Sequence, residues 1–185
     1  SFYKFGFPRF RALSEACPNA GHYALAKLEK LGYIAGLITQ NIDGLHFKAG
    51  SEQIWEVHGH LRTASCISCG AVFPFPTLLD KLDGGEIPPR CPCGGMIRPD
   101  VILFGDPMSH PYFEAERVLQ SGCDLMLAIG TSLSVYPVAG LPRLARRLAI
   151  INLQPTPYDR EAEVVIRRTI SGVLTDLVGE LTKDQ

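Results

Sequence analysis

Four cysteines stand in two close pairs, Cys66 with Cys69 and Cys91 with Cys93. Each pair can place two thiolates on one metal ion, and four thiolates complete the tetrahedral set that zinc prefers. Four protein ligands leave no position for water or substrate, so a zinc held in this way is structural rather than catalytic. The spacing therefore predicts one structural zinc per chain, although the single residue between Cys91 and Cys93 makes the second pair tighter than usual.

A second group of chemically capable residues follows the apolar segment 33–38. Gln40, Asn41 and Asp43 come within a few residues of its end, with Ile42 among them. Two amides and a carboxylate can bind a ribose, a carboxamide or a water molecule. Because strand ends in α/β folds converge on a crevice where ligands bind, this loop is a candidate ligand site.

Three further features are ambiguous when each is taken alone. His58 can transfer protons near neutral pH, but a lone histidine is more often structural. Gly130, Thr131 and Ser132 can approach a ligand, or they can form a plain strand-to-helix turn with a hydroxyl cap. Asn152 can bind a ligand at the end of a strand, or it can serve a local turn.

The elements that would hold these side chains alternate between helices and strands. A helix is expected over residues 19–31, capped by Asn19 and ended by Gly32. Beyond it the apolar pattern predicts strands at 33–38, 101–104, 125–129, 149–153 and 164–166, and helices at 112–120, 138–148 and 174–181. Strands that alternate with helices favour a parallel, doubly wound α/β sheet.

The stretch between 61 and 97 interrupts this alternation, because it is rich in cysteine, proline and glycine. Such a composition has little tendency to continue a helix-and-sheet core by itself, so the metal would have to hold it together. We therefore expect a small zinc-binding module at 61–97, inserted into an α/β domain formed by 1–60 and 98–185.

The overall composition narrows the classes of partner. The 18 basic and 19 acidic residues give a net charge of -1, so no global field would attract nucleic acid or an anionic membrane. No apolar run is long enough to span a membrane, and no signal peptide is recognisable. We expect a soluble, cytoplasmic protein that binds small molecules or other proteins. Because the sequence starts with Ser1 rather than Met, we also expect it to be a fragment.

Taken in order, the motifs resemble those of the sirtuins, and the resemblance covers nearly the whole chain from about Phe5. One such motif would be weak evidence, whereas six in the family's order and spacing are specific. The matching segments are Pro18-Asn19-x2-His22, Thr39 to His46, His58-Gly59, the two cysteine pairs, Arg98 to Asp106, and Gly130-Thr131-Ser132.

The resemblance implies a Rossmann-like domain, of the deoxyhypusine synthase-like NAD-binding type, with an inserted zinc-ribbon module. It also implies that NAD, as a co-substrate, and an acyl-lysine protein or peptide enter the cleft between the two from opposite sides. The implied activity is NAD-dependent removal of acetyl or other acyl groups from lysine side chains, giving nicotinamide and O-acyl-ADP-ribose. Nucleic acid and membranes are not among the implied partners.

By position, the resemblance also assigns roles to the candidate residues. His58 would be the general base, with Asn41 and Asp43 in the catalytic group. The cofactor site would comprise Gln40, Asn41, Ile42, Asp43, Gly130, Thr131, Ser132 and Asn152. The substrate site would comprise Ile102, Phe104 and Gly105, where the backbone would pair with the peptide as an added strand.

The sequence departs from the family pattern in two places. Asp106 stands where the family usually has Glu, which shortens a carboxylate in the substrate loop. The sequence also contains neither the Gly-Ala-Gly-x-Ser loop of the family's first strand-helix unit nor the Asp-Phe-Arg segment that follows it. These segments would cradle the pyrophosphate and cover the nicotinamide, so we expect part of the cofactor site to be absent.

Two alternative functions remain open at this point. The same scaffold can serve NAD hydrolysis or ADP-ribosyl transfer, although neither reaction needs a peptide tunnel. A chain without the Gly-rich unit can also be a catalytically impaired, zinc-bearing interaction domain.

Overall fold

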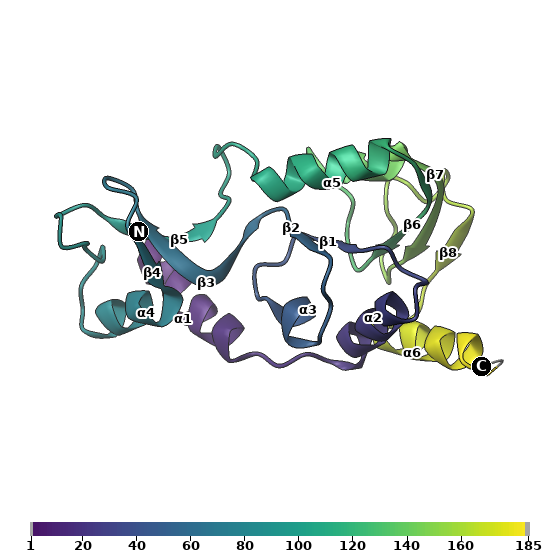
Figure 1. Cartoon of the computed structure of the whole chain (residues 1–185), viewed down its shortest axis with the longest axis horizontal. Coiled ribbons are helices and arrows are strands. Elements are labelled where there is room, and N and C mark those ends of the chain that lie inside the picture. Colours follow the sequence, from purple (N-terminus) through teal and green to yellow (C-terminus); the bar gives the residue numbers. More distant parts are fainter. Residues whose placement is uncertain (1, 184–185) are drawn as a thin grey trace.

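The computed structural model describes residues 2–183, which form two lobes along one long axis (Figure 1). The α/β lobe lies on the right in that view and contains the C-terminal strands and helix. The small lobe lies on the left and contains the N-terminal helix and the cysteine-rich segment. The elements labelled β1, α3 and β2 lie between them.

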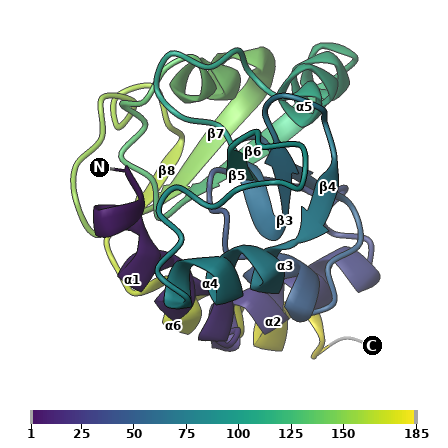
Figure 2. The ribbon, with the colours of Figure 1, turned by 90° about the vertical axis from the view of Figure 1, so that its left-hand side faces the viewer.

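The α/β lobe is built around three parallel strands in the order β6-β7-β8. In Figures 1 and 2 this sheet lies between two helical layers. Met126 of β6 packs in the cluster of Tyr112, whereas Leu127 packs in the cluster of Leu25, as expected when successive strand residues face opposite sides. The strands are β6 (Cys123–Ile129), β7 (Ala145–Ile151) and β8 (Val164–Ile166), and the helices are α2 (Ala20–Lys30), α5 (His110–Gln120), α6 (Ile170–Leu181) and the 3-10 helix η1 (Val138–Leu144).

A second parallel ladder lies beside this sheet. β1 (Leu37–Thr39) pairs with β2 (Ile54–Glu56), and the short helix α3 (Leu45–Lys48) connects them. Ile38 of β1 packs in the same apolar cluster as Met126 of β6, yet no ladder joins β1 to β6 within residues 2–183. The predicted parallel α/β fold is confirmed, but its strands form two ladders, and β1 and β6 each keep one edge without a strand partner in the described part of the chain.

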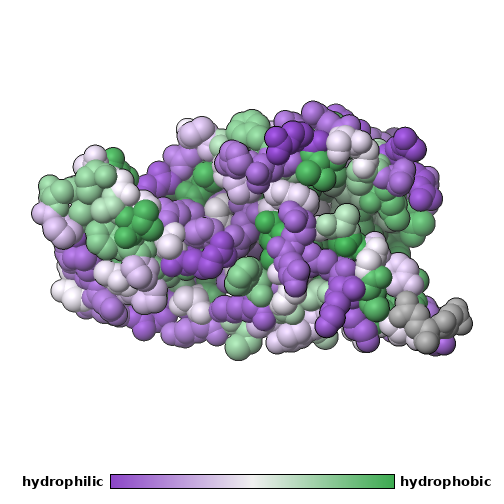
Figure 3. All heavy atoms as spheres, viewed as in Figure 1, coloured by the Kyte–Doolittle hydropathy of each residue, from purple (hydrophilic) through white to green (hydrophobic). Residues whose placement is uncertain are grey.

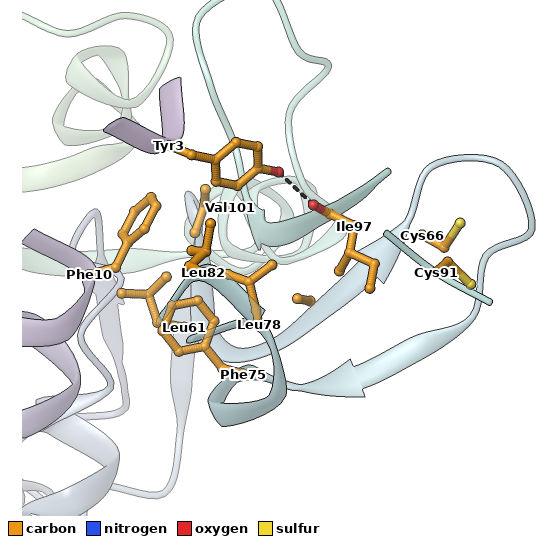
Figure 4. Packing of buried hydrophobic residues seen from close by; sticks show 11 residues of the cluster. Tyr3, Phe10, Leu61, Cys66, Phe75, Leu78, Leu82, Cys91, Ile97 and Val101 are labelled. Carbon is orange, nitrogen blue, oxygen red and sulfur yellow. Dashed lines mark hydrogen bonds between the residues drawn. The ribbon is translucent and has the colours of Figure 1, made fainter. Parts of the chain in front are cut away.

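The small lobe is an antiparallel sheet in the order β4-β3-β5, covered by two helices. Phe10 meets Phe75 edge to face, with ring centroids 6.1 Å apart, and the Tyr3 hydroxyl donates to the Ile97 carbonyl oxygen at 2.5 Å (Figure 4). These contacts fix the N-terminal helix to the cysteine-rich sheet. The elements are α1 (Phe2–Glu15), β3 (Gly59–Cys66), β4 (Val72–Pro74), α4 (Phe75–Asp83) and β5 (Ile97–Val101).

Helix α2 begins and ends as the sequence predicts. The side chain of Asn19 accepts hydrogen bonds from the amides of Gly21 and His22 at 2.9 and 3.2 Å. Gly32 follows the last turn with a φ of 80°. Local capping chemistry was therefore sufficient to place this helix.

Several of the expected elements are wrong in their bounds. The strand expected at 149–153 is β7, Ala145–Ile151, and the helix expected at 174–181 already begins at Ile170. The helix expected over 138–148 is a 3-10 helix that ends at Leu144, because Pro142 has no amide to donate, and the strand β7 already begins at Ala145. The first strand is confined to residues 37–39. The strand expected at 101–104 lies instead at 97–101, where it pairs with β3.

Figure 3 shows hydrophilic and hydrophobic residues interspersed over both lobes on the face that it displays. Among residues 2–183, no helix is both long and apolar enough to cross a membrane.

Candidate functional site

The four paired cysteines come together in the small lobe, where their sulfur atoms all lie within 4.8 Å of one another. The Sγ atoms of Cys66 and Cys93 are 3.6 Å apart, and those of Cys69 and Cys91 are 3.7 Å apart. A tetrahedral zinc with Zn–S bonds of about 2.3 Å sets its sulfur atoms roughly 3.8 Å apart, so the four side chains fit this ion. The cysteine cluster therefore matches a structural zinc site.

Backbone amides favour the charged form of these sulfur atoms. The amides of Ser68 and Gly95 each lie 3.4 Å from a sulfur atom, that of Cys66 and that of Cys93 respectively. Hydrogen bonds from the backbone of Cys69 and Ser68 lower the pKa of Cys66 to about 6. A thiolate, rather than a thiol, is the form that binds zinc.

We expect Gly95→Ala to weaken zinc binding about tenfold or more. Substitution of residues that support metal ligands typically lowers metal affinity about 10- to 100-fold. A Cβ at this position would lie 2.6 Å from the Cys66 sulfur atom, which is far inside van der Waals contact. Competition with a zinc-binding dye measures the affinity. Gly84→Ala is the matched control, because a Cβ there would lie 3.4 Å from its nearest neighbour, the carbonyl oxygen of Asp80. Equal zinc affinity in both variants would contradict the expectation.

A cavity of about 360 Å³ lies beside the polar loop that follows β1. Six of the residues singled out in the sequence line it, namely Gln40, Asn41, Ile42, Asp43, His58 and Ile102. They come from two segments of the chain that precede β3 and from the segment that follows β5. The structure thus brings the candidate base, the amides and the carboxylate to one cavity.

His58 is oriented by the polar loop. Its Nδ1 atom lies 3.2 Å from the carbonyl oxygen of Gln40. Because a carbonyl oxygen can only accept, this hydrogen bond places the ring proton on Nδ1 and leaves Nε2 of the neutral ring as a proton acceptor. The arrangement can remove a proton from a ligand in the cavity.

Glycine is required directly after His58, because β3 and β5 approach each other closely there. A Cβ on Gly59 would lie 2.2 Å from the carbonyl oxygen of Asp100, and Gly59 has a φ of 77°. The amide of Ile102 then donates to the carbonyl oxygen of His58 at 2.8 Å. The His-Gly pair therefore ties the candidate base to the segment that follows β5.

The polar loop is also shaped by its own side chains. Asp43 accepts a hydrogen bond from the amide of Leu45 at 2.9 Å, and the hydroxyl of Thr39 accepts one from the amide of Asn41 at 3.1 Å. Such side-chain-to-backbone bonds hold a loop without regular secondary structure. They keep the loop at the edge of the cavity.

Two histidines of the matching motifs lie outside this cavity. The rings of His22 and His46 pack with their centroids 4.8 Å apart, and His22 completes the capping box of α2 with Asn19. Burial lowers the pKa of both rings. They support the packing of α2 against α3 and do not line the cavity.

The turn after β6 reaches the polar loop through one contact. The side-chain amide of Gln40 donates to the hydroxyl of Thr131 at 3.4 Å. Ser132 shares a hydrogen bond of 2.6 Å with Ser134 instead, and Gly130 has a φ of 60°. The structure therefore connects Thr131 with the polar loop and places its two neighbours in the same turn.

Asn152 lies at the end of β7 and is engaged locally. Its side-chain amide donates to the carbonyl oxygen of Gln154 at 2.8 Å, and its own carbonyl oxygen accepts from Arg167 at 2.9 Å. It does not line the cavity beside the polar loop.

The segment 102–106, which we call the docking loop, leaves the cavity with Ile102 and turns outward. Phe104 is 99% exposed, and Gly105 follows it with a φ of 93°. Ile102 therefore lies at the cavity wall, whereas Phe104 projects into solvent, and the predicted substrate role of both residues stays a prediction.

Four residues that line the cavity were not foreseen, namely Phe10, Leu13, Val101 and Leu103. The first two belong to α1, whose apolar residues recur at helical spacing. Gly6 and Pro8 inside this helix obscured the signal, since both residues usually interrupt helices.

Together, the parallel α/β lobe, the four-cysteine site that fits zinc and the cavity lined by residues 40–43 and His58 define a class of α/β proteins with a small cysteine-rich module and a ligand cavity. A model of the Sir2 family matches residues 1–137. The chain belongs to the Sir2 family, the sirtuins.

Relatives and solved structures agree with this assignment. An NAD-dependent protein deacetylase 2 of Caldanaerobacter subterraneus is 50% identical over 177 residues, which cover 95% of this chain and 70% of the relative. The NAD-dependent protein deacetylase of Sulfolobus acidocaldarius is 44% identical over 185 residues, which cover 98% of this chain and 73% of that relative. A structure of Sir2 bound to acetylated peptide superimposes with a TM-score of 0.91 at 34% identity, covering 97% of this chain and 77% of that chain. A second solved structure, described as Sir2-p53 peptide-NAD+, has a TM-score of 0.88 at 33% identity. The match covers 97% of this chain and 80% of that chain.

Proposed function

We propose that this chain removes acetyl groups from lysine side chains of proteins and consumes NAD as a co-substrate, releasing nicotinamide and O-acetyl-ADP-ribose. The observation that carries the proposal is the position of His58, which lines the same cavity as Asn41 and Asp43 and whose Nδ1 contact with the Gln40 carbonyl oxygen leaves Nε2 as the proton acceptor. Membership of a family whose relatives are named NAD-dependent protein deacetylases supports it.

In the proposed reaction, the acyl oxygen of the lysine substrate attacks the ribose carbon that bears nicotinamide, and the bond from that carbon to the nicotinamide nitrogen breaks. Gln40, Asn41, Ile42 and Asp43 would hold the nicotinamide and ribose in the cavity, so that the two reactants meet in a fixed orientation. His58 would then remove a proton from a ribose hydroxyl, which attacks the acyl carbon. Water adds to that carbon, the bond from it to the lysine nitrogen breaks, and the amine leaves with a proton, so that the acyl group stays on the ribose. Gly130, Thr131, Ser132 and Asn152 would contact the phosphate and adenosine side.

The proposed peptide substrate would bind along the docking loop. The backbone around Gly105 would pair with an extended peptide as an added strand, and the acyl-lysine would enter past Ile102. Phe104 is 99% exposed, so its side chain leaves the docking loop accessible to such a peptide.

We infer that the free edges of β1 and β6 accept one further parallel strand, from the Gly-rich strand-helix unit that this sequence does not contain. Side chains of both strands already join the same clusters, as Ile38 and Met126 do. A strand inserted there would place its following loop at the carboxyl ends of β1 and β6, beside Gln40 and Thr131. Such a loop supplies backbone N–H groups for the pyrophosphate.

We expect the 185-residue chain alone to bind NAD weakly and to deacetylate slowly, because those N–H groups are missing. Fusion of a sirtuin Gly-rich strand-helix unit ahead of residue 1 should produce robust deacetylation of an acetyl-lysine peptide. Calorimetry measures NAD binding, and mass spectrometry measures the deacetylated peptide.

The matched control is a fusion in which the glycines of the loop are replaced by valine. This control should lose the gain in NAD binding and in deacetylation. Tight NAD binding by the unfused chain would contradict the inferred strand. Absence of deacetylation in the fusion, with NAD bound, would contradict the proposed function itself.

The remaining assignments are proposals as well. We propose that a zinc module, 61–97, is inserted into an α/β domain, 1–60 with 98–185, that helix α1 of this domain packs on the module, and that the chain holds one zinc. We propose a cytoplasmic location, because four thiolates reserved for zinc persist best in a reducing compartment.

A further inference from the structure

The docking loop is held by an arginine from the strand that precedes it. Arg98 donates to the Asp106 carboxylate, at 2.6 Å to Oδ2 and 3.4 Å to Oδ1, and to the carbonyl oxygen of Val101 at 2.9 Å. One guanidinium therefore binds the residue before the loop and the residue at its far end. The two side chains are 31% and 28% exposed, so water competes for this ion pair only in part.

Asp106 also closes the loop on itself. Its Oδ2 atom accepts a hydrogen bond from the amide of Leu103 at 3.0 Å, and its own amide donates to the Leu103 carbonyl oxygen at 3.0 Å. The φ of 93° at Gly105 suits the third residue of a type II turn. Hydrogen bonds from Arg98 and from the Leu103 amide lower the pKa of Asp106, so the carboxylate stays charged until the pH falls through that lowered value.

No other carboxylate takes this place in the described part of the chain. Asp100 is near enough to Arg98 to raise its pKa, but the Asp100 side chain accepts a hydrogen bond from the hydroxyl of Thr63. The hydrogen bonds of Arg98 to a carboxylate therefore all go to Asp106.

The turn, rather than packing, determines where Phe104 points. This side chain is 99% exposed, so neighbouring residues contribute little to its position. At the other end of the loop, the amide of Ile102 is tied to the carbonyl oxygen of His58. The clamp between Arg98 and Asp106 thus fixes the loop relative to the candidate base.

We propose that Arg98 and Asp106 are positioning residues that order the docking loop before an acetyl-lysine peptide binds. This inference rests on the proposed function. A loop that is ordered in advance loses little conformational entropy when the peptide binds, so the peptide binds more tightly. The short side chain of Asp106 suits this positioning role. A glutamate would place its carboxylate about 1.5 Å, one C–C bond, farther along, away from the Leu103 amide or from Arg98.

The test compares Asp106→Asn with the wild-type 185-residue chain. Binding is measured by fluorescence anisotropy with a fluorescein-labelled peptide that carries one acetyl-lysine between uncharged residues. Because these neighbours carry no charge, loss of the Asp106 charge cannot change binding through them directly. We expect the variant to bind about tenfold more weakly, the cost of ordering one or two loop residues. Hydrogen exchange of the Leu103 amide should become faster, and Asp106→Glu, which keeps the charge, should bind with intermediate affinity.

Glu86→Gln is the matched control, because it removes an acid that pairs with Lys81 in the same lobe, away from the docking loop. It should leave both readouts unchanged, and all variants should keep the zinc content and melting temperature of the wild type. Wild-type affinity or unchanged Leu103 exchange in Asp106→Asn would overturn the positioning role. A third outcome separates the clamp from the peptide function. If Leu103 exchange is faster in Asp106→Asn, the clamp is confirmed. If the wild-type chain nevertheless binds the acetylated peptide no better than the unacetylated one, the peptide function is overturned, and the inference with it.

Discussion

Replacement of His58 by alanine is expected to lower the rate of deacetylation by about 100- to 10,000-fold, the usual contribution of a general base. The variant is made in the fusion that carries the Gly-rich unit, where turnover is measurable. The hydrogen bond from Nδ1 to the Gln40 carbonyl leaves Nε2 as the proton acceptor, and no other histidine lines this cavity. Attack by the acyl oxygen needs no base, so exchange of labelled nicotinamide into NAD should be partly retained.

His110→Ala is the matched control, since the side chain of His110 is 83% exposed and pairs with Glu114 on α5. It should change neither deacetylation nor exchange. Retained deacetylation in His58→Ala would transfer the base to another group, with His60 as the first candidate. If His58→Ala instead lowers the melting temperature and abolishes both reactions, His58 is a structural residue.

Removal of zinc is expected to unfold the small lobe while the α/β lobe remains folded. Structural zinc sites contribute about 10–16 kcal/mol in small zinc-finger peptides, which equals or exceeds the whole stability of a typical domain. Cys91→Ser should have the same effect as a chelator, because three thiolates hold the ion more weakly than four. Hydrogen exchange of β3 and β5 amides measures the unfolding of the small lobe.

The single tryptophan provides an internal control for this experiment. Trp55 packs in the cluster of Val57 and Tyr112, so its fluorescence reports on the α/β side of the molecule and should change little. Cys17→Ser is the matched variant, because Cys17 is exposed and lies outside the cysteine cluster. Freshly purified protein without zinc, together with an unchanged melting temperature in Cys91→Ser, would contradict the metal assignment.

Sequence patterns located those elements that depend on local chemistry. Asn19 and Gly32 determine the ends of α2, and the β-branched and apolar run of β8 placed that strand at its observed bounds. The 3-10 helix before β7 was missed because Leu and Arg residues around Pro142 fit a helical period, while the pairing of β7 with two neighbours is a long-range effect. Local propensity carries no information about such pairing.

The candidate site was predictable where motifs are continuous in the sequence. The segment 40–43 and His58 line one cavity, although they belong to different segments. Phe10 and Leu13 could not be foreseen, because only the docking of α1 on α4 brings them to the cavity. The ion pair of Arg98 with Asp106 was also hidden, since a spacing of eight residues gives contact only when Gly105 allows the chain to turn.

The most direct test of the proposed deacetylase counts the products of NAD consumption with and without an acetyl-lysine peptide. We expect the active fusion to form nicotinamide, deacetylated peptide and O-acetyl-ADP-ribose in equal amounts, with little NAD cleaved when the peptide is omitted. NAD cleavage that proceeds at the same rate without peptide and yields plain ADP-ribose would contradict the proposal and identify the chain as an NAD hydrolase.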